Sequence, residues 1–583
     1  MRLVKVFLMI VIASLSVLAL PSLIPSASRD NRPAIVSYNP PPANNFHSPL
    51  SAAGLIGVAK ATPNLQSQSS SSQTTSSGSG STTIPQNALR FIIDSSYFPQ
   101  SETTVAIDPS NPSHVVGGVN DLKFFFCGAL PSDCAVTPAS ISGFTTSTDG
   151  GASVAKSSDL PNIAPQGQVL VSFGDPSVAA SIDGNFFYAS LAISPTNFAN
   201  GIMISKSSGN LFNNGVSCTT SPSHSFTNPC WNAVFVFGNL SSTANTFEDK
   251  ELIAVDHNPA SPFFGSVYIS WDHFNADGTT SSYIARCNND LSSCVMISGG
   301  GQPVVSGSDP FPAFATPAVD KSGNLYVTWC NYGTFTTFGP ISCRIRSSPP
   351  GGTSFGATTT ILSFMGSGTT LPTDTVIVGF ATEQFRVTSI PSLATDLSSS
   401  SNNLYFAIQV CSAGHYYQFS PAVAPVAADN PGNCGVGAIL FSKSTNGGSA
   451  WSTPVTLSQP AVNDQPYVTV DSTTGQVYVV YYTTQFDQFN HRIDVVASKS
   501  NDGGKSFTQL RVTSVSNEPN SDPEMYDYTV ASGFGGSFVV PQYGDYLQAT
   551  ARAGTLWVLF TGNYAVEAGT FQADPFLAVL TGQ

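Results

Sequence analysis

The phrase SKSNDGGKSF, at residues 498–507, recurs along the chain and constrains the fold more than any other feature of the sequence. A tight hairpin needs backbone at positive φ, which glycine supplies, and short Ser and Asp side chains can bond the exposed N–H groups of such a turn. We therefore predict that the phrase is a structural clasp. A calcium-binding loop is the alternative, which most copies disfavour because they carry at most one carboxylate. The clearest copies contain Ser147, Asp149 and Gly151, then Ser444, Gly448 and Trp451, then Ser500, Asp502, Gly504 and Phe507.

A second motif alternates with the clasp: a strand that ends in Asp in most copies, a turn, and an aromatic strand. Successive copies are roughly 65 to 80 residues apart, a period typical of a radial or stacked array. Each period then holds an inner hairpin and an outer hairpin with a clasp, which makes four antiparallel strands, as in a propeller blade. The seven copies span residues 104–119, 177–192, 252–271, 316–329, 391–408, 467–482 and 546–560.

The predicted fold class is therefore all-β, a seven-bladed β-propeller of four-stranded antiparallel blades, with six blades as the alternative. The last repeat lacks a clasp. We expect ALRFIID, at residues 88–94, to supply the fourth strand of that blade and so close the ring without open edges. Composition agrees, since only 10% of residues are charged while 11% are aromatic, a profile that favours many short strands and turns.

Three regions are expected along the chain. Residues 1–28 resemble a signal peptide, with Arg2 and Lys5 before an apolar stretch and small residues up to Ser28,; an uncleaved membrane anchor is the alternative. Residues 29–87 are rich in Ser, Thr and Pro and predict a disordered linker or stalk. Residues 88–583 form the predicted propeller. The protein is thus expected to be secreted or held at the cell surface, touching a membrane only through an uncleaved anchor.

Charge and cysteine content narrow the functional classes. The net charge of −14 argues against nucleic acid or an anionic membrane as a partner. Ten cysteines in an exported chain predict disulfides, and a zinc site is disfavoured because no CxxC or HExxH motif occurs. Five local bridges are the simplest pairing: Cys127/Cys134, Cys218/Cys230, Cys287/Cys294, Cys330/Cys343 and Cys411/Cys434.

The clasp resembles the Asp-box, or BNR repeat, of the sialidase superfamily, and the resemblance covers about residues 88–583. It implies an exported sialidase-like propeller that binds or hydrolyses extracellular glycans or glycoproteins. Asp-boxes also occur in propellers that are not sialidases, so the alternative is a non-catalytic surface, adhesion or protein-binding scaffold, with calcium as a possible stabilising ion and no other cofactor expected.

Carboxylates cluster just before the predicted inner strands, and a radial arrangement would direct them to one rim. Several acids at a shared mouth would raise one another's pKa values or recruit a cation. Strand capping and solubility are the alternative explanation. The acids concerned are Glu102, Asp175, Asp249, Glu251, Asp464 and Asp545, with Asp309 as a looser match.

The resemblance also implies catalytic residues: an arginine triad that reads a substrate carboxylate, a tyrosine nucleophile with a glutamate, and an aspartate as acid/base. Arg386 and Arg552 lie nearest to inner strands and are the candidate substrate-binding arginines. Glu524, Tyr526 and Asp545 are the candidate catalytic residues. A mouth rich in acid nevertheless opposes an anionic sugar such as sialic acid.

Overall fold

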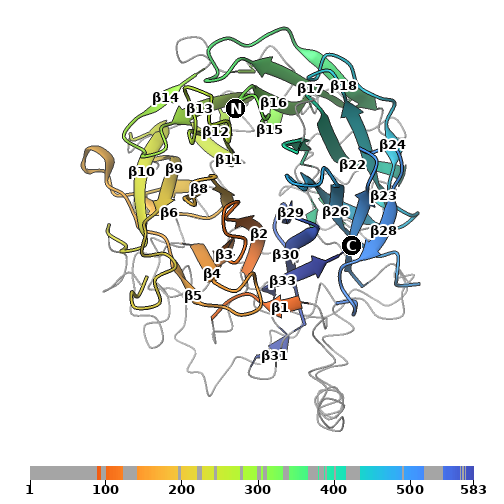
Figure 1. Cartoon of the computed structure of the whole chain (residues 1–583), viewed down its shortest axis with the longest axis horizontal. Helices are drawn as coiled ribbons and strands as arrows, with labels where there is room; N and C mark the ends of the chain where they lie inside the picture. The colour runs from red at the N-terminus through yellow and green to blue at the C-terminus, as the bar shows by residue number, and fades with distance from the viewer. Residues whose placement is uncertain are drawn as a thin grey trace, which may run out of the picture.

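Short antiparallel strands joined by turns form almost all of the described chain. The computed structural model describes residues 88–582 with gaps at 94–99, 122–140, 195–198, 219–225, 242–245, 276–279, 298–303, 306–311, 332–340, 365–377, 380–385, 388–389, 399–401, 415–433, 489–491, 518–542, 565, 568–569 and 572. The strands pair into seven four-stranded blades arranged around a central axis (Figure 1). The predicted fold class is confirmed, with seven blades rather than six.

The first four blades follow one another in chain order. In blade 2 the innermost strand is split, because β6 and β7 both pair with β8. Blade 1 contains β2 (Gln100–Ile107), β3 (Val115–Asp121), β4 (Ser142–Ser147) and β5 (Lys156–Asp159); blade 2 contains β6 (Val171–Ser172), β7 (Ser177–Ala180), β8 (Phe186–Ile193), β9 (Asn200–Ser207) and β10 (Trp231–Asn239); blade 3 contains β11 (Phe247–Val255), β12 (Val267–Phe274), β13 (Thr280–Cys287) and β14 (Cys294–Met296); blade 4 contains β15 (Pro312–Val319), β16 (Leu325–Asn331), β17 (Ile341–Ser348) and β18 (Thr359–Phe364).

The remaining blades continue around the ring, and two short hairpins, β19–β20 and β31–β32, lie outside the blade pattern. A 3-10 turn, η3 (Pro165–Gly167), precedes β6. Blade 5 contains β21 (Ser392–Thr395), β22 (Leu404–Gly414), β23 (Cys434–Ser444) and β24 (Val455–Thr456); blade 6 contains β25 (Asn463–Val470), β26 (Val477–Thr483), β27 (Asp494–Ser500) and β28 (Thr508–Arg511); blade 7 contains β29 (Gln548–Arg552), β30 (Thr555–Gly562), β33 (Asp574–Thr581) and β1 (Ala88–Arg90); the short hairpins contain β19 (Val378–Gly379) with β20 (Arg386–Val387) and β31 (Val566–Glu567) with β32 (Thr570–Phe571).

The ring is closed by strands from the two ends of the described chain. β1 pairs antiparallel with β33, so that Ala88 lies opposite Ala578 and Arg90 opposite Phe576. Arg90 donates from Nε and Nη2 to the buried carboxylate of Asp574, at 2.6 and 3.0 Å. The prediction that the segment beginning at residue 88 completes the last blade is therefore confirmed.

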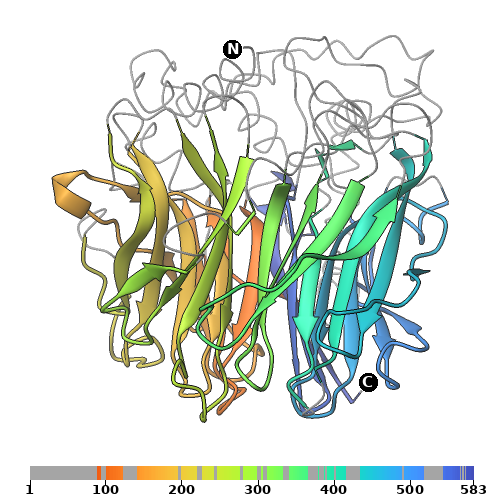
Figure 2. The same ribbon diagram turned by 90° about the horizontal axis from the view of Figure 1, so that it is seen from above.

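The core lies between the blades, because each blade packs its two faces against its neighbours (Figure 2). Strands buried on both faces need continuous apolar runs rather than alternation. β8, with the sequence FFYASLAI, is buried at every position, and so is β26, with the sequence VYVVYYT. One core cluster shows the packing directly, since Phe441 of blade 5 lies with Val468 and Val479 of blade 6.

The clasps have the hydrogen bonds that the sequence predicts. Ser500 Oγ donates to Asp502 Oδ1 at 2.7 Å and accepts the N–H of Gly504 at 2.8 Å, while Asp502 accepts the N–H of Ser506 at 3.0 Å. The turns at Ser147 and at Ser444 repeat this pattern.

Each clasp also contacts the preceding blade. The ring of Phe507 lies 4.9 Å from that of Phe441, edge to face. Gly504 has a positive φ of 75° and no room for a Cβ against Phe441. The glycine is therefore required twice, once by the backbone conformation and once by the blade beside it.

Three of the predicted disulfides are present: Cys218–Cys230, Cys287–Cys294 and Cys330–Cys343. Cys330 and Cys343 are directly opposite in β16 and β17, so this bridge joins the second and third strands of blade 4, as expected. Cys127 and Cys134 lie outside the described residues, and the side chains of Cys411 and Cys434, in β22 and β23, lie outside the described part. Those two pairs stay predictions.

Within the described part of the chain, none of the helices has the length and apolar character needed to span a bilayer. The signal, linker and propeller boundaries at residues 28 and 87 stay predictions.

The Arg90→Ala variant tests the ring closure. It removes a charge-assisted pair from a buried carboxylate, which is expected to cost about 2 to 3 kcal/mol and to lower the midpoint of urea unfolding measured by tryptophan fluorescence. The exposed Arg492 provides the control, since Arg492→Ala should leave the midpoint unchanged. An unchanged midpoint in both variants would show that β1 does not hold the ring together.

Candidate functional site

A left-handed residue lies at the entry to the inner strand of six blades and builds the site; in β2, β11, β15 and β25 a register shift marks a bulge there. At the bulge one residue adopts the left-handed conformation, which is uncommon for residues other than glycine and re-aims the side chain. Strained residues of this kind concentrate at functional sites. The left-handed residues are Glu102 (φ 52°), Asp175 (φ 51°), Lys250 (φ 61°), Phe314 (φ 60°), Gln465 (φ 49°) and Gly544 (φ 88°), from blades 1, 2, 3, 4, 6 and 7.

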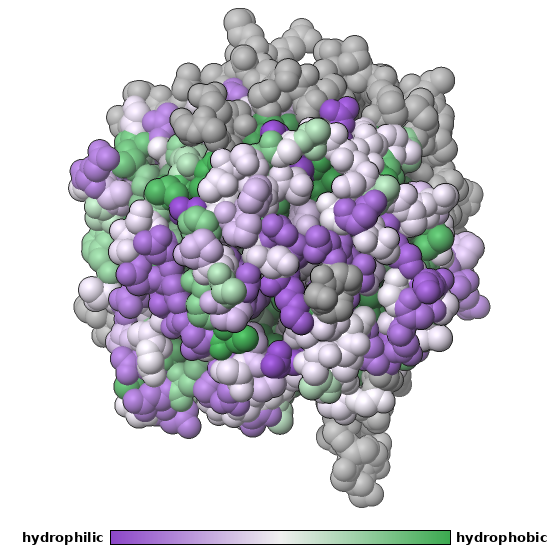
Figure 3. All heavy atoms as spheres, turned by 45° about the horizontal axis from the view of Figure 1, so that its top comes forward, coloured by the Kyte–Doolittle hydropathy of each residue, from purple (hydrophilic) through white to green (hydrophobic). Residues whose placement is uncertain are grey.

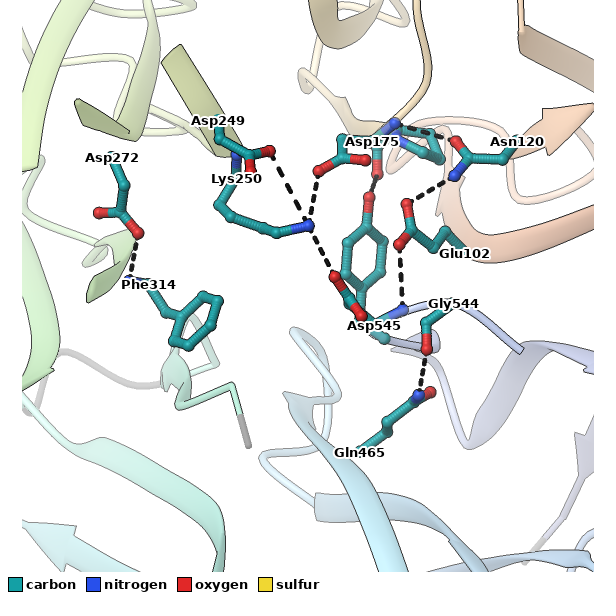
Figure 4. A network of polar contacts seen from close by, with 12 residues as sticks. Glu102, Asn120, Asp175, Asp249, Lys250, Asp272, Phe314, Gln465, Gly544 and Asp545 are labelled. Carbon is teal, nitrogen blue, oxygen red and sulfur yellow. Dashed lines mark hydrogen bonds and ion pairs between the residues drawn. The ribbon is translucent and has the colours of Figure 1, made fainter. Parts of the chain in front are cut away.

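Lys250 lies at the centre of a cluster of carboxylates from three blades (Figure 4). Its Nζ lies 2.6 Å from Asp545 Oδ2, 2.9 Å from Asp175 Oδ2 and 3.8 Å from Asp249 Oδ1. Asp249 precedes Lys250 in β11, whereas Asp175 comes from the break in the inner strand of blade 2 and Asp545 from the segment before β29. One ammonium group therefore connects blades 2, 3 and 7.

Glu102 and Asn120 extend the cluster through blade 1. Asn120 Nδ2 donates to Glu102 Oε2 at 2.7 Å, and Asn120 Oδ1 accepts the N–H of Asp175 at 2.9 Å. The other oxygen of Glu102 accepts the N–H of Asp545 at 3.1 Å. Gln465 of blade 6 then donates from Nε2 to the carbonyl oxygen of Gly544 at 2.6 Å. The polar contacts thus run without a break through blades 3, 2, 1, 7 and 6.

Burial and mutual repulsion keep part of this cluster protonated. Burial and the neighbouring Asp175 raise the pKa of Glu102 well above its usual range. Burial raises the pKa of Asp249 to about 8, and this carboxyl also shares a hydrogen bond with Asp175. Burial disfavours the Lys250 ammonium, but Asp175, Asp249 and Asp545 outweigh it and raise its pKa well above the usual lysine value. At neutral pH the cluster therefore holds a permanent cation and protonated acids that can donate hydrogen bonds.

Two further buried acids flank the cluster. Glu251 follows Lys250, and Asp464 precedes Gln465 in β25; each is 1% exposed. Their carboxyl oxygens have no hydrogen-bond partner among the described residues. Burial raises both pKa values strongly, with Asp175 adding to the effect on Glu251 and Asp545 to that on Asp464. Burial therefore favours the neutral form of both groups.

Exposure separates the atoms that a ligand could reach from those behind them. The side chains of Lys250, Asp175 and Asp249 are 11%, 12% and 18% exposed, whereas that of Asp545 is fully buried. A ligand at the axis would meet the Lys250 ammonium group and the carboxyl groups of Asp175 and Asp249, which share a hydrogen bond. Asp545 holds Lys250 from behind and offers no surface of its own.

The structure brings together four of the acids that the sequence predicts, Glu102, Asp175, Asp249 and Asp545, and places Glu251 and Asp464 beside them. One part of the prediction is wrong: Glu102, Asp249 and Asp464 lie within β2, β11 and β25, not before these strands. The strand continues past the acid because the bulge interrupts the register without ending the pairing. Asp309 lies outside the described residues.

The remaining candidates do not join the cluster. Arg552 stands at the last position of β29, the end opposite Asp545, where its Nη1 donates to Ser472 Oγ at 3.0 Å. Arg386 lies in β20, and its side chain is outside the described part. Glu524 and Tyr526 fall in the undescribed range 518–542.

Sequence reasoning missed Lys250, Asn120 and Gln465. A signal for Lys250 was present, since it lies inside the acidic run FEDKE in a chain with only 21 basic residues. No comparable signal marks Asn120 in β3 or Gln465 in β25.

The described residues contain no group of three or more His, Cys, Asp or Glu side chains arranged to hold a metal ion. At the acidic cluster the Lys250 ammonium takes the position among the oxygens that a cation would need. The calcium expectation stays untested.

Comparisons with known proteins extend to fold only. No family model and no curated protein matches the chain. Among solved structures, the Hadza microbial sialidase Hz136 is 10% identical, with a TM-score of 0.38 over 76% of this chain and 73% of its own. A Trypanosoma rangeli sialidase with the inhibitor DANA is 10% identical, with a TM-score of 0.34 over 70% and 55%. A PL25 ulvan lyase is 10% identical, with a TM-score of 0.31 over 67% and 80%. With TM-scores below 0.5, these similarities carry no argument about function.

The close approach of blades 7 and 1 is tested by Gly544→Ala. The new Cβ would overlap Glu102, and the alanine would have to adopt a left-handed backbone. The free energy of unfolding should therefore fall by more than the roughly 1 kcal/mol that a left-handed alanine alone costs. Gly554→Ala is the matched control, because Gly554 has a similar φ of 77° with nothing near its Cβ. Equal losses in the two variants would contradict the packing described for Glu102.

The protonated acids predict a pH dependence of stability. Because the folded state holds the Asp249 proton up to about pH 8 while the unfolded chain releases it near pH 4, the free energy of unfolding should fall as pH rises between these values. Urea unfolding from pH 5 to pH 9 should show a shallower fall in Asp249→Asn. Asp149→Asn is the control, since hydrogen bonds to Ser147 and Ser153 outweigh the small effect of burial and lower the pKa of Asp149, outside this window. Identical slopes in wild type and Asp249→Asn would contradict the raised pKa.

Proposed function

We propose that this protein is a secreted or cell-surface propeller that binds extracellular glycans at the Lys250 cluster. The observation that carries the proposal is the convergence of partly exposed Lys250, Asp175 and Asp249 on one end of the central axis. Sugars are recognised through hydroxyl groups that both donate and accept hydrogen bonds. A fixed ammonium next to carboxyl groups in both protonation states supplies both kinds of partner within one site.

The charge of the site favours neutral or amino sugars over acidic ones. More carboxyl groups than cations surround the axis in the described structure, and the whole chain carries a net charge of −14. A ligand carboxylate would meet repulsion from Asp175 and Asp545, whose attraction for Lys250 already uses that cation. We therefore do not propose sialic acid as the ligand.

Hydrolysis is a possible extension of the binding role. Asp249, with a pKa of about 8 and partial exposure, fits the role of a proton donor to a leaving glycosidic oxygen. Asp545 fits a positioning role, because it is buried against Lys250. Glu524 and Tyr526 remain the proposed nucleophile pair. An exo-sialidase mechanism has less support, since no arginine among the described residues contacts Lys250, Asp175 or Glu102.

A non-catalytic scaffold is the second candidate. One observation favours it: Lys250 is fully engaged by its own neighbours, as expected of a group that mainly fixes three blades around an axis. In that case the cluster would stabilise the ring, and partners would bind elsewhere.

A glycan-binding panel followed by calorimetry tests the proposal on the full-length mature protein. Asp249→Asn and Lys250→Gln should each weaken binding of the best neutral or amino glycan at least about tenfold, since one or more charge-assisted hydrogen bonds are lost. Lys321→Ala, which changes an exposed lysine in a blade 4 turn, should bind as the wild type does.

The same proteins, checked for folding by circular dichroism, are then assayed on fluorogenic glycosides. Release of sugar by the wild type and its loss in Asp249→Asn would add the hydrolytic role. Glycan binding that survives both substitutions would overturn the assignment to this cluster, and absence of any glycan ligand would leave the scaffold.

A further inference from the structure

A second constellation lies at the outer edge of blade 6, away from the axis. The large hydrophobic side chains that are exposed on the described surface are scattered: Ile93, Ile182, Phe226, Val295, Val455 and Phe486. Figure 3 likewise shows small hydrophobic areas mixed with hydrophilic ones on the face in view. Phe486 differs from the others because its ring, 42% exposed, lies against a guanidinium group, with Arg511 Cζ 4.3 Å from the ring centroid.

Arg511 is held rigidly from the protein side. Its Nε and Nη2 donate to Asp494 Oδ1 at 3.0 and 2.8 Å, and Nη2 also donates to Ser516 Oγ at 3.1 Å. The Asp494 side chain is fully buried and accepts further hydrogen bonds from Thr513 and Ser516, both at 2.6 Å. A buried, fully bonded carboxylate therefore fixes the plane of a guanidinium group at the surface, which is how a recognition arginine is preorganised.

One edge of this guanidinium group is left for a ligand. Nη1 of Arg511 makes no hydrogen bond to any residue that the structure describes, and the side chain is 35% exposed. The exposed ring of Phe486 lies against the same guanidinium group, with Cζ over the ring. A fixed donor for an anion thus adjoins an apolar face on which a ring can stack.

Two other arginines stack on phenylalanine rings, and both donate hydrogen bonds to backbone carbonyl oxygens. Arg346, over Phe355, donates to the carbonyl oxygens of Gly356, Val304 and Phe355. Arg286, over Phe263, donates from Nη1 to the carbonyl oxygen of Gly351. These two arginines donate to the protein's own backbone. Arg511 instead donates to a carboxylate, through Nε and Nη2, and its Nη1 makes no hydrogen bond to the described residues.

The site lies on the same face of the disc as the Lys250 cluster. Asp494 begins β27 opposite Thr483, and Thr483 is opposite Asn463, which begins β25 beside Asp464. Arg511 ends β28, the outermost strand of the blade. The two sites therefore differ in radial position and in the groups they present: the inner one presents an excess of carboxyl groups, and the outer one presents the guanidinium group of an Arg511–Asp494 pair.

We propose that Phe486 and Arg511 form a second binding site, for a sugar that carries a carboxylate, such as a uronic acid residue in an acidic glycan. The carboxylate accepts from Nη1 of Arg511, and the apolar face of the sugar ring stacks on Phe486. The strongly acidic chain repels anions at long range, so selectivity for the carboxylate must come from this local arginine. The inference is independent of ligand binding at the Lys250 cluster.

Calorimetric titration with a galacturonic acid oligomer and with the neutral galactose oligomer of equal length tests the proposal. The wild type should bind the acidic oligomer at least tenfold more tightly than the neutral one. Arg511→Gln should remove this preference, and Phe486→Ala should weaken both the binding and the stacking signature in saturation-transfer NMR. Lys250→Gln should not change acidic-oligomer binding, which separates this site from the inner one.

Arg346→Gln is the matched control, because it removes a stacked arginine that donates to backbone carbonyl oxygens and should leave the preference unchanged. Since Arg511→Gln deprives buried Asp494 of its partner, Arg511→Lys is included; it keeps the charge but loses the planar geometry, and is expected to bind at least threefold more weakly than the wild type. Equal binding of the two oligomers by the wild type, or full acidic-oligomer binding by folded Arg511→Gln and Phe486→Ala, would overturn the proposal.

Discussion

The contacts of the Lys250 ammonium group are the interaction on which the inner end of the ring depends. Its contacts with Asp175 and Asp545 hold blades 2, 3 and 7 at one point, where bulges in the inner strands aim charged side chains at one another. Without this cation the clustered acids would face each other across a low-dielectric interior, and a buried carboxylate without a partner is costly. Partial protonation of Glu102 and Asp249 relieves the rest of the repulsion.

Both proposed binding sites rest on this kind of arrangement. At the axis, protonated and ionised carboxyl groups lie next to one ammonium group, and for this reason we propose hydroxyl-rich ligands of low charge there. At the outer edge of blade 6, Asp494 is also buried, but here it presents a cation outward through Arg511. In both places a buried acid orients a basic group, and what differs is whether the basic group turns inward or toward solvent.

Much of the fold followed from the sequence because its determinants are local. The Ser–Asp–Gly clasps close through hydrogen bonds within a few residues. The last repeat lacks a clasp, and this predicted that the segment at Ala88 supplies the fourth strand of blade 7. The site was predictable in part, since acids at a repeated position must converge if the repeat is radial. Lys250 and Gln465 were missed because left-handed bulges change where a side chain points without changing the strand pattern. Arg552 lies at the end of β29 opposite the cluster, and closeness to an inner strand does not reveal which end of the strand a residue occupies.

The central claim is that neutral carboxyl groups and the Lys250 ammonium group coexist at the axis near pH 7. Infrared spectroscopy measures this directly, because protonated carboxyl groups have a C=O stretch distinct from that of carboxylates. The account predicts a protonated-carboxyl band at pH 7 that loses intensity in Asp249→Asn and also in Glu102→Gln. A spectrum at pH 7 without that band, or one that both substitutions leave unchanged, would contradict it.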